Sequence, residues 1–218
     1  MPHYIWLMEE YLMSEFSLDN INAMYMDVLK ELGNIGAGNA TTAIAGMLGK
    51  KMNMSVPKVG FMDASKLGDA ICPEEETIVG IFLEVQSDIT GSMMFLMKMP
   101  AAHFLVNTIM GRDLNYNEPF DEMDLSAMKE IGNIIAGSYL SALSNMTNLR
   151  ILPSVPYIAV DMAASILSVP AIQFGQYGDN ALYIETEFGD DVLMGGYFIL
   201  MPDPDSYTSI MNALGIPV

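Results

Sequence analysis

The chain has 218 residues, of which 51% are hydrophobic, so it is long enough to bury a substantial core. Its 27 acidic and 9 basic residues give a formal net charge of −18, which repels nucleic acid and anionic lipid headgroups. The single cysteine, Cys72, excludes an intramolecular disulfide and a CxxC metal site, as suits a reducing compartment.

Residues 1–16 mix aromatic side chains with Glu9 and Glu10 and have no counterpart later in the chain, so they form either a short docked helix or a frayed extension. The start lacks the basic region of a secretory signal. Residues 92–111 have about the length of a membrane span, but they carry Lys98 and other polar residues, so they predict a strand and a core helix. We expect a cytoplasmic protein without membrane insertion.

The rest of the chain divides into two similar units. In the first, a helix from Ser17 or Asp19 to about Gly49 has an apolar stripe of Ile21, Met24, Val28, Leu32 and Ile35. It is followed by a strand at 52–61, a helical or irregular link at 64–70, an antiparallel pair of strands at 77–85 and 91–97, and a helix at 101–110.

The second unit repeats this order after a polar connection at 112–120. Its predicted elements are a helix at 121–145, a strand at 151–160, a helical link at 161–167, strands at 181–187 and 192–201, and a helix at 205–214. A unit of about 100 residues is barely large enough to stand alone, so we expect the two to share one sheet about a pseudo-two-fold axis.

The prediction is therefore an α+β fold in a single domain over residues 1–218, built from two helix-strand-link-strand-strand-helix units with two long helices. The extension covers residues 1–16, the first repeat about 17–111, the linker about 112–120, and the second repeat about 121–218.

One polar pattern occurs in both units at a spacing of 99 residues. Its identical members are Glu31 and Glu130, Asn34 and Asn133, Gly33 and Gly132, Gly38 and Gly137, and Pro57 and Pro156. On a helix, Asp27, Glu31 and Asn34 fall within about 60° of one another, and Ser126, Glu130 and Asn133 do the same. An ordinary solvated helix face would also look like this; the two prolines, at equal distances from the two asparagines, favour a functional motif.

The glycines of the first helix break a local rule, because glycine inside a helix costs up to about 1 kcal/mol relative to alanine. Either another backbone, such as the sister helix, or a partner protein comes close to them; we favour the sister helix, although Ile135 replaces the equivalent of Gly36. A dinucleotide-binding loop is rejected, because Gly33, Gly36 and Gly38 lie within a helix and not between a strand and a helix.

At these residues the chain resembles the CheC family of bacterial chemotaxis phosphatases, within the CheC/CheX/FliY group. The family pattern is Asp or Ser, three residues, Glu, two residues, Asn, then 22 residues and Pro. It is met by Asp27, Glu31, Asn34 and Pro57, and again by Ser126, Glu130, Asn133 and Pro156. Two intact copies resemble CheC itself, whereas CheX-type chains resemble a single site and FliY-type chains add flagellar-switch regions.

The resemblance implies a phosphatase of two-component signalling that hydrolyses the aspartyl phosphate of the response regulator CheY (CheY-P). Asn34 or Asn133 would orient the attacking water, and Glu31 or Glu130 would dock on a lysine of the regulator. Asp27 and Ser126 would tune the edge of each site, and Pro57 and Pro156 would shape it.

No metal of the chain's own is implied, since His3 and His103 have no partners in the repeat; the regulator would supply Mg²⁺. Two other functions stay open. The chain could bind the receptor deamidase CheD outside the polar faces, with weak catalysis, or be a structural component of the flagellar switch.

Overall fold

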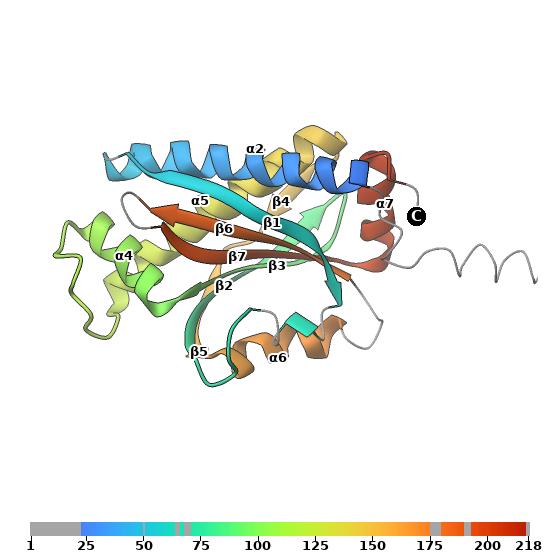
Figure 1. The fold of residues 1–218 in the computed structure, drawn as a ribbon. Helices are drawn as coiled ribbons and strands as arrows, with labels where there is room; N and C mark the ends of the chain where they lie inside the picture. The colour runs from blue at the N-terminus through green and yellow to red at the C-terminus, as the bar shows by residue number, and fades with distance from the viewer. Residues whose placement is uncertain are drawn as a thin grey trace, which may run out of the picture.

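Two long helices lie along one side of a curled sheet in the computed structural model of the chain (Figure 1). The structure describes residues 23–49, 51–63, 66–67, 71–174, 180–189 and 193–216. The extension at 1–16 and the predicted helix start at Ser17 or Asp19 lie outside the described residues, as does most of the link at 64–70.

Both units have the predicted order of elements. The first contains α2 (Ala23–Leu48), β1 (Asn53–Asp63), β2 (Thr77–Ser87), β3 (Gly91–Lys98) and α4 (Met99–Met110). The second contains α5 (Glu122–Thr147), β4 (Ile151–Pro153), β5 (Tyr157–Met162), α6 (Ala163–Phe174), β6 (Asn180–Gly189), β7 (Leu193–Pro202) and α7 (Pro204–Ala213). The long helices α2 and α5 have 26 residues each and begin at positions 23 and 122, so the 99-residue spacing of the motif is also the spacing of the helices.

The strands of the described chain form one antiparallel sheet in the order β1-β6-β7-β3-β2-β4, and β5 also pairs with β2. If each strand is replaced by its counterpart in the other unit, the same order is obtained, read from the other edge of the sheet. A pseudo-two-fold axis therefore passes between the central strands β3 and β7. The first strand of each unit pairs with a strand of the other unit: β1 with β6, and β4 and β5 with β2. The predicted shared sheet is confirmed.

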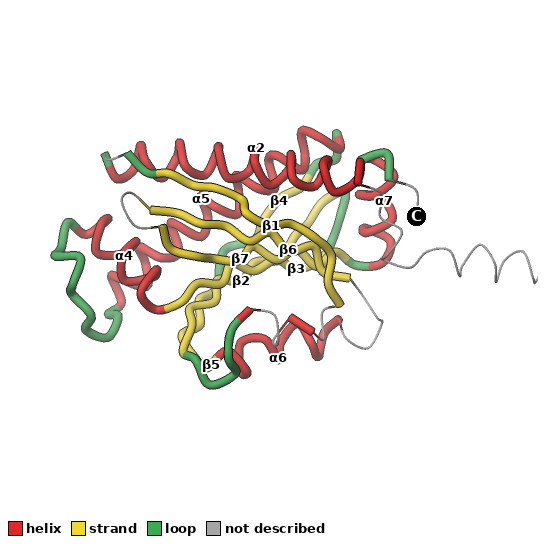
Figure 2. The backbone as a smooth tube through the Cα atoms, viewed as in Figure 1, coloured by secondary structure: helices red, strands yellow, loops and turns green. Residues whose placement is uncertain are grey.

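Side chains alternate between two cores along the central strands, as expected for strands with both faces covered. On the face covered by α2, α5, α4 and α7, β2 contributes Val79, Ile81 and Leu83 to the larger core. On the opposite face, where α6 lies, Ile78 belongs to a smaller core with Ile166 of α6 (Figure 2).

The second unit departs from the prediction at its first strand. Residues 151–160 form two strands, β4 and β5, because the chain leaves the ladder at 154–156, where Pro156 has no N–H to donate. The helical link predicted at 161–167 is the longer helix α6.

The apolar stripe predicted for α2 is also only partly right. Leu32 is buried as expected, but Val28 and Ile35 are half-buried, and the stripe is centred on Leu29, Leu32, Gly33, Gly36 and Ala40. Small residues dominate this stripe because α2 packs closely on both the sheet and α5, and a pattern counted from large apolar side chains overlooks them.

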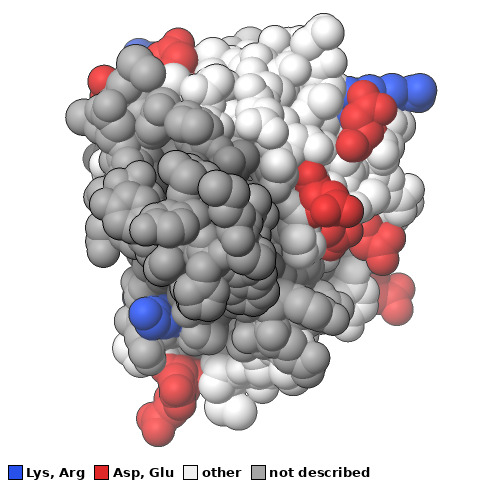
Figure 3. All heavy atoms as spheres, turned by 90° about the vertical axis from the view of Figure 1, so that its right-hand side faces the viewer, with Lys and Arg blue, Asp and Glu red and all other residues white. Residues whose placement is uncertain are grey.

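Figure 3 shows how the charged side chains are distributed on the described part of one face. On the described part of the face in Figure 3, acidic side chains form separate groups and no continuous patch. The basic side chains drawn on that described part lie far apart and form no stripe of the kind that follows a nucleic-acid backbone.

Candidate active site

Both copies of the polar motif lie on the solvent side of the helix pair. The exposed motif residues make two surfaces, which we name the α2 face (Asp27, Glu31 and Asn34) and the α5 face (Ser126, Glu130 and Asn133). Each face is exposed because the opposite side of its helix is buried against the sheet and the sister helix.

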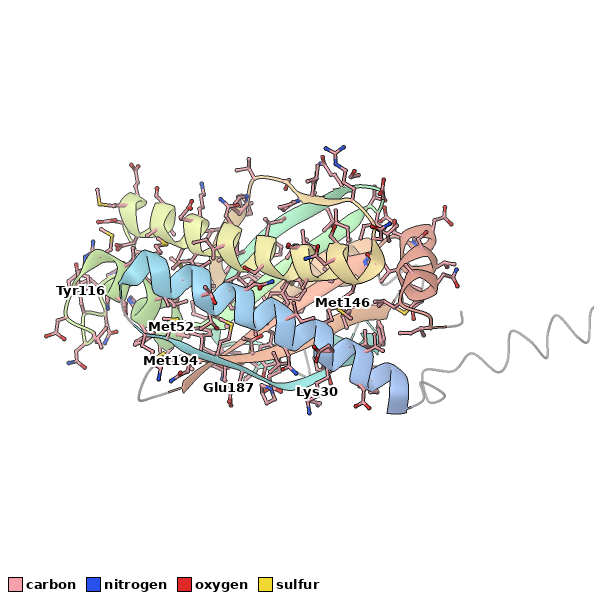
Figure 4. The ribbon with its side chains drawn as sticks, turned by 90° about the horizontal axis from the view of Figure 1, so that it is seen from above. Lys30, Met52, Tyr116, Met146, Glu187 and Met194 are labelled. Atoms are coloured by element: carbon pink, nitrogen blue, oxygen red, sulfur yellow. The ribbon has the colours of Figure 1, made fainter. Side chains whose placement is uncertain are left out.

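The two faces are separate sites. The helices α2 and α5 lie side by side and run in opposite directions, as Figure 4 shows from above. Because each motif occupies the N-terminal half of its helix, the faces lie toward opposite ends of the pair. The structure therefore keeps the residues of each copy together and does not merge the copies into one site.

The motif side chains have few partners within the protein. Among the described residues, the side chains of Glu31, Asn34, Glu130 and Asn133 make no hydrogen bond or ion pair with another side chain. Ser126 differs, since its hydroxyl donates to the carbonyl of Glu122 at 2.8 Å. Carboxylate and carboxamide groups on both faces are therefore available to a partner molecule.

The two prolines lie where the first strand of each unit is irregular. Pro57 is exposed on the edge strand β1, at the register shift between Ser55 and Lys58, and Pro156 is buried between β4 and β5. Proline suits such positions because it cannot donate to a ladder. The residues that precede the two prolines also differ in exposure, since Val56 is buried and Val155 is 86% exposed. The prolines shape the strands beneath the helices and contribute no reactive group.

The glycines that face inward allow close packing. A Cβ at Gly33 would lie 3.0 Å from Cγ1 of Val56, and one at Gly132 would lie 2.6 Å from Cγ2 of Ile81. A Cβ at Gly36 would overlap the ring of Tyr139 on α5. Sister-helix contact, the cause favoured from the sequence, thus holds for Gly36, but the neighbour is a side chain and not a backbone.

Tyr139 is firmly held in that position. Its hydroxyl is 3.0 Å from Oγ1 of the buried Thr186, and its ring stacks on Phe198 with centroids 4.4 Å apart. Burial raises the pKa of Tyr139 to about 12, and the hydrogen bond with Thr186 opposes the shift only in part.

A cluster of charged residues anchors the start of α5 just before the α5 face. Asp121 caps the helix, and Asp124 completes a capping box by accepting from the backbone of Asp121. Arg112 donates to the buried carboxylate of Asp124 at 2.7 Å. Sequence reasoning placed a helix start near Asp121 but missed this anchor; the D-x-x-D spacing after an arginine-bearing linker was the available signal.

The described residues lack both a metal-ligand cluster and a membrane-spanning helix. Within them, no three His, Cys, Asp or Glu side chains come together as possible metal ligands. No helix in the described ranges is long and apolar enough to cross a membrane.

Comparison with known proteins places these observations in a family. The family model described as "CheC-like family" matches residues 24–60 and 123–159, and each matched segment holds one complete copy of the motif with its proline. The chain is 34% identical over 202 residues to the CheY-P phosphatase CheC of Bacillus subtilis, covering 90% of this chain and 97% of that protein.

More distant relatives include flagellar proteins. The flagellar motor switch phosphatase FliY of Bacillus subtilis is 28% identical over 142 residues, which are 65% of this chain and 37% of that protein. The crystal structure of Thermotoga maritima FliY has the same fold, with a TM-score of 0.71 at 20% identity, covering 90% of this chain and 98% of that one. With CheC matched along nearly its whole length, the chain belongs to the CheC-like family.

Proposed function

We propose that the chain is a protein phosphatase that hydrolyses the aspartyl phosphate of the response regulator CheY at the α2 face and the α5 face. The observation that carries the proposal is that each face presents a Glu and an Asn to solvent, without partners among the described residues. The relative named as the CheY-P phosphatase CheC supports it.

The chemistry needs little from this chain. Water attacks the phosphorus atom, the P–O bond to the aspartyl carboxyl group breaks, and the products are the free carboxylate and inorganic phosphate, which takes both protons of the water. An acyl phosphate is already activated, so the helper protein needs only to hold the water in line for attack. The regulator itself would supply the Mg²⁺ and the lysine that stabilise the developing charge.

The motif residues fit these tasks. The carboxamide of Asn34 or Asn133 can donate to and accept from a water, and it brings no negative charge toward the phosphoryl group. The carboxylate of Glu31 or Glu130 pairs with a lysine beside the phosphorylation site of the regulator and sets the docking register. Asp27 and Ser126 adjust the edge of each face.

The decay of phosphorylated CheY tests the proposal. The decay rate should rise in proportion to the concentration of the chain, whereas free acetyl phosphate, which has an acyl phosphate but no regulator, should decay unchanged. An unchanged decay of CheY-P would contradict the proposal, and so would equal hydrolysis of acetyl phosphate.

We further propose that the chain binds CheD through a surface outside the two faces. The specific observation is an apolar cleft of about 670 Å³ on the face of the sheet that α2 and α5 do not cover. Its lining includes the exposed Tyr157 and Val169. A cleft bordered by exposed apolar side chains is typical of a protein-binding surface.

Pull-down with CheD separates this role from catalysis. Binding should persist in Asn34→Ala combined with Asn133→Ala and should be lost in Tyr157→Asp combined with Val169→Asp. Leu114→Asp, in the exposed linker, is the matched control. Loss of binding with the asparagines alone would contradict a separate surface.

A further inference from the structure

Two glycines that recur at one position of the long helices are not explained by packing among the described residues. Gly38 and Gly137 occupy the same position in α2 and α5, and a Cβ at either would meet nothing within 4 Å. Any residue with a better helix propensity would fit there without a clash. Packing therefore accounts for Gly33, Gly36 and Gly132 but not for this pair.

Both glycines lie on the proposed catalytic faces. Gly38 follows Asn34 by four residues, as Gly137 follows Asn133, so each lies one turn beyond the asparagine on the same side of the helix. Gly38 also falls within about 20° of Asp27 and Glu31 around the helix axis.

Since the duplication, the exposed residues of α2 have become partly different from their counterparts in α5 and have partly stayed the same. Several exposed residues of α2 have different counterparts in α5: Asp27 and Ser126, Asn39 and Ser138, Thr42 and Ser141, and Gly46 and Asn145. Other exposed residues are kept, such as Lys30 with its counterpart Lys129 and Met47 with its counterpart Met146, and the glycine belongs to this kept group together with the Glu and the Asn.

The short side chain of asparagine explains why a glycine one turn later would be useful. The amide of an asparagine extends only roughly 4 Å from its Cα, so the helix must come very close to a partner for that amide to touch a phosphoryl group. A bulky side chain one turn later would hold the two surfaces apart. Glycine removes this obstacle, because without a Cβ it lets another backbone lie directly against the helix.

We propose that Gly38 and Gly137 are positioning residues that let a backbone segment of the phosphorylated regulator, beside its phosphoryl aspartate, lie directly on α2 or α5. This inference rests on the proposed phosphatase function. It adds the position at which the partner's main chain crosses each helix.

Substitutions at the two glycines should raise the stability of the protein while they lower its activity. Gly38→Ala combined with Gly137→Ala should raise the Tm by about 2–4 °C per site, because alanine favours the helix. The same variant should lower kcat/KM for CheY-P, mainly through KM. Gly38→Leu combined with Gly137→Leu should lower kcat/KM at least about tenfold, since leucine also suits a helix but projects further.

Gly46→Ala is the matched control, because Gly46 is exposed on α2 with nothing within 4 Å of its Cβ position, about 12 Å beyond Gly38 along the helix. It should raise the Tm and leave kcat/KM unchanged. If the leucine variant keeps full activity, or the alanine variant has a lower Tm than the wild type, the inference about the glycines is wrong. An active wild-type chain would still support the proposed function in that case. An inactive wild-type chain would overturn both.

Discussion

Asparagine and glutamate on each face are assigned different steps of one reaction. In the proposed mechanism, Asn34 and Asn133 act on the water in the transition state, whereas Glu31 and Glu130 hold the docked regulator in both the ground state and the transition state. Interactions of the second kind lower KM without raising kcat. On each face, the glutamate is thus assigned to binding and the asparagine to the chemical step.

Glutamine substitutions test that separation. Glu31→Gln combined with Glu130→Gln keeps the shape of each side chain but removes its charge, so KM for CheY-P should rise about tenfold or more while kcat changes little. Steady-state phosphate release at several CheY-P concentrations gives both constants. A fall in kcat at unchanged KM would instead assign the glutamates to the chemical step.

The helix pair is the element on which both faces depend. At the crossing, Gly36 of α2 receives the ring of Tyr139 from α5, and the pseudo-two-fold relates this pair to Ile135 and Ala40, which are both buried. In both pairs the small residue lies on α2 and the large residue lies on α5, so α5 carries Ile135 at the position where α2 carries Gly36.

Gly36→Ala should destabilise the protein by about 1–2 kcal/mol, although alanine has the higher helix propensity. The added methyl group meets Tyr139, which cannot retreat because it stacks on Phe198 and bonds to Thr186. Urea denaturation measures the free energy of unfolding of Gly36→Ala, with Gly46→Ala as the control. Equal stability of the two variants would show that the crossing has spare room.

Patterns in neighbouring residues predicted most helices and strands. The predictions were wrong where contacts between residues distant in the sequence determine the structure. The span of α5 follows from its periodicity and from the cap at Asp121, and Gly111 ends α4 with φ at 64°. The stripe of α2 was misread because its centre consists of small residues whose burial reflects the neighbouring helix. The break before β5 was missed because Pro156 could also have been an edge-strand residue, like Pro57.

For the candidate site, spacing alone placed Glu31, Asn34 and their counterparts on two exposed faces, because a helix wheel depends only on sequence. The pairing of β1 with β6 was not predictable in the same way, because it joins residues more than 100 positions apart. The same holds for the different purposes of the glycines, which became clear only with their neighbours in place.

At the scale of the whole molecule, we propose that the two units fold as one domain. The sheet passes from unit to unit at β1 and β6, at β7 and β3, and at β2 with β4 and β5. The helices α2 and α5 also pack across the boundary between the units. Each unit alone would expose the edges and apolar faces that the other covers.

Residues 1–111 and 112–218, made separately, should therefore show no cooperative thermal unfolding, and co-expression should restore it. Circular dichroism during heating measures this directly. A cooperatively unfolding fragment of either unit would contradict the single domain.

Release of phosphate from CheY-P by four proteins tests the central claim: wild type, Asn34→Ala, Asn133→Ala and the double variant. Both substitutions are exposed, so all four proteins should keep the wild-type Tm. With two independent faces, the rates of the single variants above spontaneous decay should sum to the wild-type rate, and the double variant should fall to the spontaneous rate of CheY-P alone. A folded double variant that still releases phosphate at the wild-type rate would contradict the account.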